Sequence, residues 1–226
     1  MLRDAWLVFQ KDLTIERRSR EVLFTVITFS VLSAVIFALS FYMDEDTAKA
    51  YGPGVIWVTV LFAGTLGLQR LFESERENDC MAGLLLSPAD PRGIYLGKVL
   101  VQLWFSGWML VITVPVIFLF FDLFRVMDAN RAALLVLILI LGTVGFALLG
   151  TLFAAMLLNM RLKDVLLPVI VYPLVTPVLI AGVQSTRALL RGEGLESVSG
   201  WLTLLAAFNL IYAAVSLVLF PLMVRE

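Results

Sequence analysis

Histidine is absent from this chain of 226 residues, cysteine occurs once, and charged residues make up only 15% of the sequence. Without histidine, the chain cannot build a His-ligated zinc or haem-iron site, a His-dependent catalytic triad or a histidine proton switch. The single cysteine, Cys80, cannot form an intramolecular disulfide. Because 17 basic residues nearly balance 18 acidic ones, no overall basic field favours nucleic acid. The sequence therefore predicts no metal site and no nucleic-acid partner.

Charge is missing most clearly from six long stretches. The chain is 61% hydrophobic, whereas an ordinary soluble domain is about 45–50% apolar. A helix needs roughly 20 apolar residues to cross a bilayer, and these stretches lack the period-2 alternation of barrel strands. The sequence thus predicts an all-α integral membrane protein, with one transmembrane domain over 22–224 and six spans. The stretches without Asp, Glu, Lys or Arg are 22–42, 52–68, 99–121, 132–158, 165–183 and 201–224.

Basic residues between these stretches predict the orientation. Lys and Arg are concentrated before the first stretch and in segments 69–98 and 159–164. The positive-inside rule then places these segments and both termini in the cytoplasm. Trp57 and Trp201 fall near the opposite ends of their stretches, where tryptophans form interfacial belts. We expect both tryptophans near the outer membrane surface.

Residues 1–21 have the pattern of an amphipathic helix. Apolar residues recur at spacings of four, three and four, which is one helical face. This pattern favours a helix lying in the inner headgroup layer, in contact with membrane lipid, before the chain enters the bilayer. The alternative is a solvated basic anchor that only sets topology. The apolar face includes Trp6 and Phe9 with Leu2 and Leu13, and the polar face includes Lys11 and Asp12.

The longest polar segment, 69–98, is the candidate coupling segment. A charged helix is predicted to end at Gly83, three leucines follow it, and Asp90-Pro91-Arg92-Gly93 is predicted to form a turn. Thirty residues are long for a plain connector, and a leucine triplet should not face water. The pattern favours a docking element for a cytoplasmic partner, with a solvated connector as the alternative. The candidate coupling residues are Glu73, Glu75, Arg76, Glu77, Leu84, Leu85, Leu86, Ser87 and Pro88.

Residues Gly93–Lys98 resemble a phosphate-binding loop only superficially. A Walker A loop needs four residues between its glycines and a Ser or Thr after its lysine. Here three residues separate Gly93 from Gly97, and Val99 follows Lys98. The chain therefore has no predicted ATP site, and any energy from ATP must reach it through a partner.

The fifth stretch, 165–183, contains Pro168, Pro173 and Pro177. Each proline removes a backbone donor and favours a kink. Such broken spans persist where a cavity or a neighbour satisfies the freed carbonyls. We interpret this span as a moving or substrate-lining helix, with a static packing element as an equal alternative. Because tyrosine is the only ionisable side chain inside the six stretches, a proton-driven transporter is disfavoured.

The segment from Glu75 to Pro88, followed by Gly97-Lys98, resembles the loop pattern of half-size permeases in ABC-2 type exporters. A narrower resemblance is to the haem exporter protein B (CcmB) family of cytochrome c maturation. The residues that carry it are Pro53-Gly54-Val55-Ile56-Trp57-Val58, Leu68–Glu73, Leu85–Pro88, Lys11–Leu13, Glu16–Glu21 and the run from Leu167-Pro168 to Pro177-Val178.

This resemblance implies a non-catalytic permease subunit in a bacterial inner membrane. Its expected partners are a cytoplasmic ABC ATPase, a second copy of itself and a separate haem-handling membrane subunit. ATP hydrolysis by the partner would drive haem export or release of a haem-loaded chaperone. No tightly bound cofactor is expected, and haem would be a transported or transiently contacted ligand. The alternatives are an ABC-2 permease for another amphipathic substrate and a non-transporting scaffold of a membrane assembly complex.

Overall fold

A computed structural model describes residues 1–40, 45–73, 75 and 89–223. Within these ranges the chain consists of α-helices and one short 3₁₀ helix, with no strand, so the predicted all-α membrane fold is confirmed. The elements are α1 (Leu2–Ser19), α2 (Glu21–Ser40), α3 (Glu45–Arg70), α6 (Pro91–Phe120), η1 (Leu123–Val126), α7 (Ala129–Met156), α8 (Lys163–Leu190) and α9 (Leu195–Met223).

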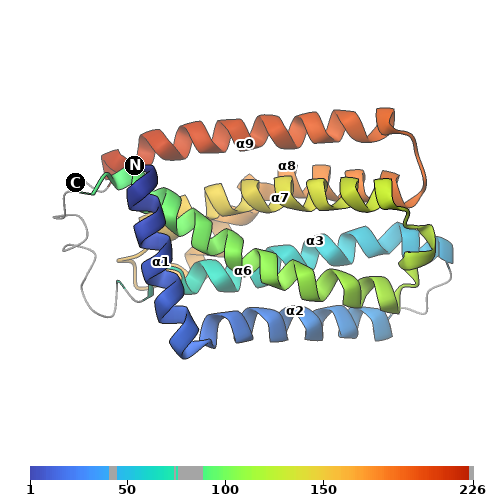
Figure 1. The fold of residues 1–226 in the computed structure, drawn as a ribbon, viewed down its shortest axis with the longest axis horizontal. Coiled ribbons are helices and arrows are strands. Elements are labelled where there is room, and N and C mark those ends of the chain that lie inside the picture. The colour runs from blue at the N-terminus through green and yellow to red at the C-terminus, as the bar shows by residue number, and fades with distance from the viewer. Residues whose placement is uncertain (41–44, 74, 76–88, 224–226) are drawn as a thin grey trace.

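Six of the described helices, α2, α3 and α6 to α9, are long and apolar enough to cross a membrane. They run side by side as a bundle, whereas α1 lies across one end of it (Figure 1). We call this the α1 end. It also holds the end of α3, the starts of α6 and α8 and the end of α9 (Figure 1). The opposite end, which holds η1, is the η1 end. The predicted helix at residues 1–21 is present as α1.

The helices differ in how much of their surface the bundle covers. In the most apolar 18-residue window of each helix, 67% of the residues of α3 and 56% of those of α7 are buried, whereas only 17% of those of α2 and 22% of those of α9 are. The outward side chains of these last two helices are large and apolar, such as Leu39 at 76% and Leu210 at 73% exposed. Such a surface is suited to contact with the hydrocarbon chains of lipid and unsuited to contact with water.

Trp57 lies inside the bundle, which corrects the expectation that it marks a membrane surface. Its side chain is 1% exposed, and its Nε1–H donates to the Thr186 hydroxyl at 3.1 Å. A Cβ added at Gly142 or Gly182 would lie 2.1 or 2.5 Å from the indole ring. Two glycines on α7 and α8 therefore make the slot that admits this tryptophan. The position of a residue along a charge-free stretch indicates its depth in the membrane, but it does not indicate whether neighbouring helices cover its side chain.

Pro53 and Gly54 of the family-like motif precede Trp57 in α3. Pro53 is buried within the helix, and nothing lies within 4 Å of a Cβ added at Gly54. Tight packing of this motif therefore concerns its tryptophan rather than its glycine.

The expected turn at residues 90–93 is wrong, because α6 begins there. The Asp90 side chain accepts a hydrogen bond from the Arg92 amide at 2.9 Å, and Pro91 occupies the first turn. An Asp cap followed by proline is a typical helix start. Helix α6 thus begins before the charge-free stretch at Val99, and Lys98 lies within a helix.

Candidate coupling site at the α1 end

The candidate coupling residues fall into two groups. Glu73 and Glu75 are described, and both follow the end of α3. Glu73 is partly exposed and pairs with Arg70 at 2.7 Å, whereas Glu75 is only 1% exposed. The rest lie outside the described residues: Arg76, Glu77, Leu84, Leu85, Leu86, Ser87 and Pro88.

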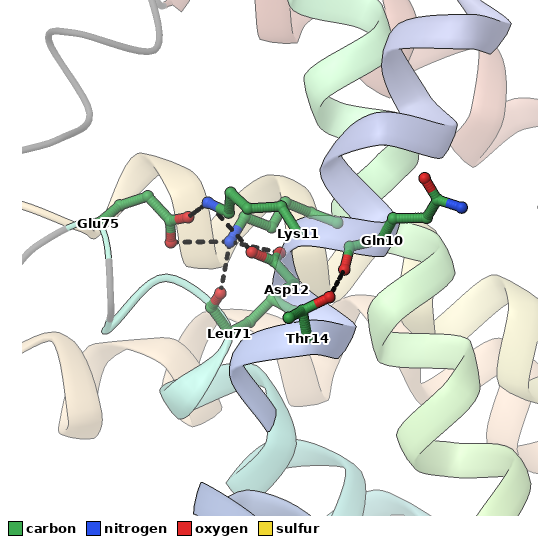
Figure 2. A network of polar contacts seen from close by, with 7 residues as sticks. Gln10, Lys11, Asp12, Thr14, Leu71 and Glu75 are labelled. Atoms are coloured by element: carbon green, nitrogen blue, oxygen red, sulfur yellow. Dashed lines mark hydrogen bonds and ion pairs between the residues drawn. The ribbon is translucent and has the colours of Figure 1, made fainter. Parts of the chain in front are cut away.

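Lys98 is the centre of a buried ion cluster. Its ammonium group lies 2.7 Å from Glu75 Oε2, 2.8 Å from Asp12 Oδ2 and 2.9 Å from the Leu71 carbonyl. It also lies 4.9 Å from the centroid of the Phe72 ring. The ammonium, carried by α6, donates hydrogen bonds to Glu75 and to the Leu71 carbonyl beyond α3, and it forms an ion pair with Asp12 of α1. Figure 2 shows Asp12 from α1 and Glu75 from beyond α3 pointing toward one another.

Lys11 completes the cluster and balances its charge. It contacts Asp12 Oδ1 at 3.1 Å and donates to the other carboxylate oxygen of Glu75. Burial alone would raise the pKa of Glu75, but Lys98 and Lys11 hold that pKa below its ordinary value. Burial alone would likewise lower the pKa of Lys11, but the carboxylates of Asp12 and Glu75 raise it. Lys11 and Glu75 are therefore held in their charged forms.

Two glycines bring α1 against α6. A Cβ at Gly93 would lie 2.8 Å from the Met1 carbonyl, and a Cβ at Gly97 would lie 2.8 Å from that of Ala5. Spaced by four residues, the glycines let the two backbones approach closely. The opposite face of α1 carries the exposed Trp6 and the half-buried Phe9, whose tilted rings have centroids 5.4 Å apart. The predicted apolar stripe thus faces away from the bundle, and the Asp12 face lies against it.

The far end of α1 is joined to α2 by a buried carboxylate. Arg20 adopts a left-handed conformation with φ of 55°, and α2 begins immediately after it. The Glu16 side chain, 7% exposed, accepts a hydrogen bond from the Leu23 amide at 2.8 Å. Burial raises the pKa of Glu16. The carboxylate satisfies an otherwise free amide at the start of α2, as a helix cap does.

The start of α8 contacts the same end of α3. Pro168 has no N–H to bond the carbonyl of Asp164, and Gln69 supplies a side-chain amide to that carbonyl at 2.9 Å. Lys163 donates in turn to the Gln69 carbonyl at 3.4 Å. The end of α3 is therefore bound on one side by α8 and on the other by α1 and α6.

The three prolines of α8 all lie within one continuous helix. Pro168 and Pro177 are half-buried, and Pro173 is exposed. Since Pro173 has no N–H, the carbonyl of Val169 lacks its usual helical donor, and the Val169 side chain is 64% exposed. A carbonyl freed in this way is tolerated in a span where a neighbouring helix, a local adjustment of the helix, water or another chain satisfies it.

A cavity of about 420 Å³ adjoins the ion cluster. It lies between α1, the start of α2, the end of α3 and α6. The lining residues used below are Asp12, Glu16, Leu71, Lys98 and Phe105. Within the described residues, no group of three His, Cys, Asp or Glu side chains could hold a metal ion.

Lys98 is the functional residue that sequence reasoning passed over. The sequence offers no Walker A pattern around it, and the spacing of residues near it indicates no other role. A lysine at the start of an apolar run needs acidic partners, and Asp12 and Glu75 are acids in the two segments predicted to lie on the same side. The sequence contained that signal, although it could not show which acid would be within reach.

Comparison with known proteins gives consistent results over nearly the whole chain. Residues 3–225 match the CcmB protein family. The chain is 32% identical over 210 residues to heme exporter protein B of Pseudomonas aeruginosa, covering 93% of this chain and 89% of that protein. It is 27% identical to heme exporter protein B of Paracoccus denitrificans, with 91% of each chain covered. The protein of the same name from Haemophilus influenzae is 28% identical, with 76% of each chain covered.

Proposed function

Since the chain belongs to the CcmB protein family, we propose that it acts as the membrane permease subunit of a haem exporter that serves cytochrome c maturation. It is a multi-pass membrane protein with six spanning helices. Its relatives are named for haem export, and haem is the cargo that we assign to this chain. ATP hydrolysis belongs to a separate ABC ATPase subunit, because the chain has no ATP-binding motif.

The observation that carries the coupling role is the fixing of the segment after α3. Glu75 is buried against Lys98 and Lys11, and in the sequence it immediately precedes residues 76–88 of the candidate coupling segment. A partner that pushes on this segment would therefore act on α1 and α6 directly. The α1 end faces the cytoplasm in this proposal, because the basic segments predict that orientation, and the membrane is the bacterial inner membrane.

Two further features support a larger assembly. Twelve spans are usual for an ABC channel, and one chain supplies six. The exposed Val169 and Pro173 face of α8 has a carbonyl that lipid cannot satisfy. We therefore propose that a second copy of the chain, or a water-filled passage between two copies, lies against α8. A haem-handling membrane subunit is the third expected partner.

Complementation of a deletion strain tests the function. Strains that lack this chain should lose haem-stained c-type cytochromes, and the wild-type chain should restore them only together with an active ATPase partner. Normal cytochromes in the deletion strain would favour a permease for another amphipathic substrate. Restoration with a catalytically inactive ATPase would favour a non-transporting scaffold.

A second test addresses docking by the leucine triplet, which remains a prediction from the sequence. Replacing Leu85 with Asp would bury an unpaired charge in an apolar interface. The variant should stay in the membrane but lose co-purification of the ATPase. Normal co-purification at normal membrane levels would show that residues 84–86 only connect.

A further inference from the structure

Lys98 binds three parts of the chain at once. Its ammonium contacts the Leu71 carbonyl and Glu75 beyond α3, and Asp12 in the middle of α1. The lysine is 1% exposed, so water cannot readily replace these contacts. A displacement of residues 71–75 must therefore move Lys98 and Asp12 with it or break a buried ion cluster.

Helix α1 continues this connection toward α2. Asp12 and Glu16 are one helical turn apart on the face of α1 that lies against the bundle. Glu16 accepts the Leu23 amide, so it joins α1 to the first turn of α2. Helix α2 is the least buried of the six spanning helices that the structure describes, and Ser30 accepts a buried 2.8 Å hydrogen bond from Thr113 of α6. Because so few residues of α2 are buried, a shift of this helix disturbs fewer packed side chains than a shift of the other spanning helices would.

The cavity beside the cluster gives this motion room. Close-packed interiors resist displacement, whereas a hollow of about 420 Å³ separates the second half of α1 from Leu71 and Phe105. The first half of α1 is fixed against α6 at Gly93 and Gly97. Helix α1 can thus pivot on its glycine contacts while its second half moves.

We propose that α1 is a relay, in which Lys98 passes movement of residues 71–75 to Asp12, and Glu16 passes it on to α2. This inference rests on the proposed function, since the movement comes from an ATPase partner. It assigns positioning roles to Lys98, Asp12 and Glu16, none of which needs to touch the cargo.

Hydrogen exchange in the purified complex of this chain with its ATPase tests the relay. The complex is compared with and without a non-hydrolysable ATP analogue, and exchange is measured in peptides from the second half of α1 and the start of α2. The wild type should show a nucleotide-dependent change in both. Lys98→Met should lose that change while still binding nucleotide. Lys98→Arg, which keeps the cation, should retain part of it.

Two further variants keep the test decisive. If Lys98→Met does not assemble, Asp12→Asn, which keeps the shape of the side chain on α1, should also lose the change. Lys163→Met is the matched control, since Lys163 contacts Gln69 beside the same segment but belongs to α8. It should leave the response of α1 intact. The relay is overturned if wild-type α1 does not respond to nucleotide, or if Lys98→Met responds like the wild type.

Failure of the relay is separable from failure of the proposed function. A complex that hydrolyses ATP and restores haem-stained cytochromes, but shows no response in α1, rejects only the relay. A wild-type chain that neither binds an ATPase nor restores cytochromes rejects the proposed function itself.

Discussion

Trp57 lies in α3 and Glu75 follows the end of that helix. Each side chain is 1% exposed, yet different interactions hold the two in place. Trp57 is held by shape, because its ring fills a slot left by Gly142 and Gly182. Glu75 is held by charge, because two lysines surround its carboxylate. The first contact lies within the bundle, and the second lies at the α1 end.

This difference separates a fixed region from a movable one. Helices in a membrane gain no hydrophobic energy from meeting one another, so close packing through small residues decides how they fit. A ring between two glycines has a single good position. An ion cluster can exchange partners among its members, and here a cavity adjoins it. We therefore expect the region around Trp57 to stay rigid and the ion cluster beyond the end of α3 to respond to a partner.

The largest expected effect comes from Lys98→Met. The substitution leaves Asp12 and Glu75 buried with Lys11 as their remaining cation, and removing one member of a buried ion pair costs about 3–5 kcal/mol. Thermal unfolding in detergent should show a clear drop in midpoint. Arg125→Gln is the control, because it breaks the exposed Arg125–Asp122 pair at the η1 end, where a loss of at most about 1 kcal/mol is expected. Equal stability of the two variants would contradict the importance of the cluster.

The next largest effect concerns the tryptophan slot. Gly182→Ala adds a methyl group within 2.5 Å of the indole ring, and such overpacking typically costs about 1–3 kcal/mol. Gly54→Ala is the matched control, since its added methyl meets nothing within 4 Å. We expect a lower unfolding midpoint for Gly182→Ala, and an unchanged or slightly higher midpoint for Gly54→Ala, because alanine favours a helix interior more than glycine does. If Gly182→Ala also abolished the nucleotide response of α1, the contrast between a rigid and a movable region would fail.

The spans were predictable from sequence because excluding charge from a bilayer is a local rule. Each charge-free stretch can be recognised without reference to the rest of the chain. All six stretches fall within described spanning helices, apart from short terminal portions. The start of α6 was misjudged because Asp90-Pro91 suits both a turn and a helix cap. The cluster was not predictable, because Asp12, Glu75 and Lys98 are far apart in the sequence and meet only once α1 packs on Gly93 and Gly97.

A smaller effect should follow from Thr186→Val. This near-isosteric change removes the acceptor of the Trp57 indole N–H but leaves the slot filled. Hydrogen bonds between membrane helices contribute about 0.6 kcal/mol on average, so the unfolding midpoint should fall only slightly. A loss as large as that of Gly182→Ala would mean that the hydrogen bond, rather than shape, holds Trp57. Tryptophan fluorescence of the variant reports whether the ring keeps its position.

The smallest effect, and the one with a pH signature, concerns Glu16 at the end of α1. Because burial raises the pKa of Glu16 above its ordinary value of 4.5, the folded state binds more protons there than the unfolded state. Stability therefore falls as pH rises from about 4.5 through the raised pKa. Glu75 has the opposite sign: its pKa is lowered, so its contribution is lost only as pH falls below about 4.5.

Glu16→Gln separates these two groups. The amide oxygen can still accept the Leu23 amide, so the cap at the start of α2 survives. We expect the variant to match or exceed wild-type stability at pH 7, by at most about 0.5 kcal/mol, and to show a flatter decline in unfolding midpoint as the pH rises above about 4.5. An unchanged slope would show that Glu16 is not the group that titrates. A marked loss of stability at pH 7 would show that its negative charge itself holds α1 to α2.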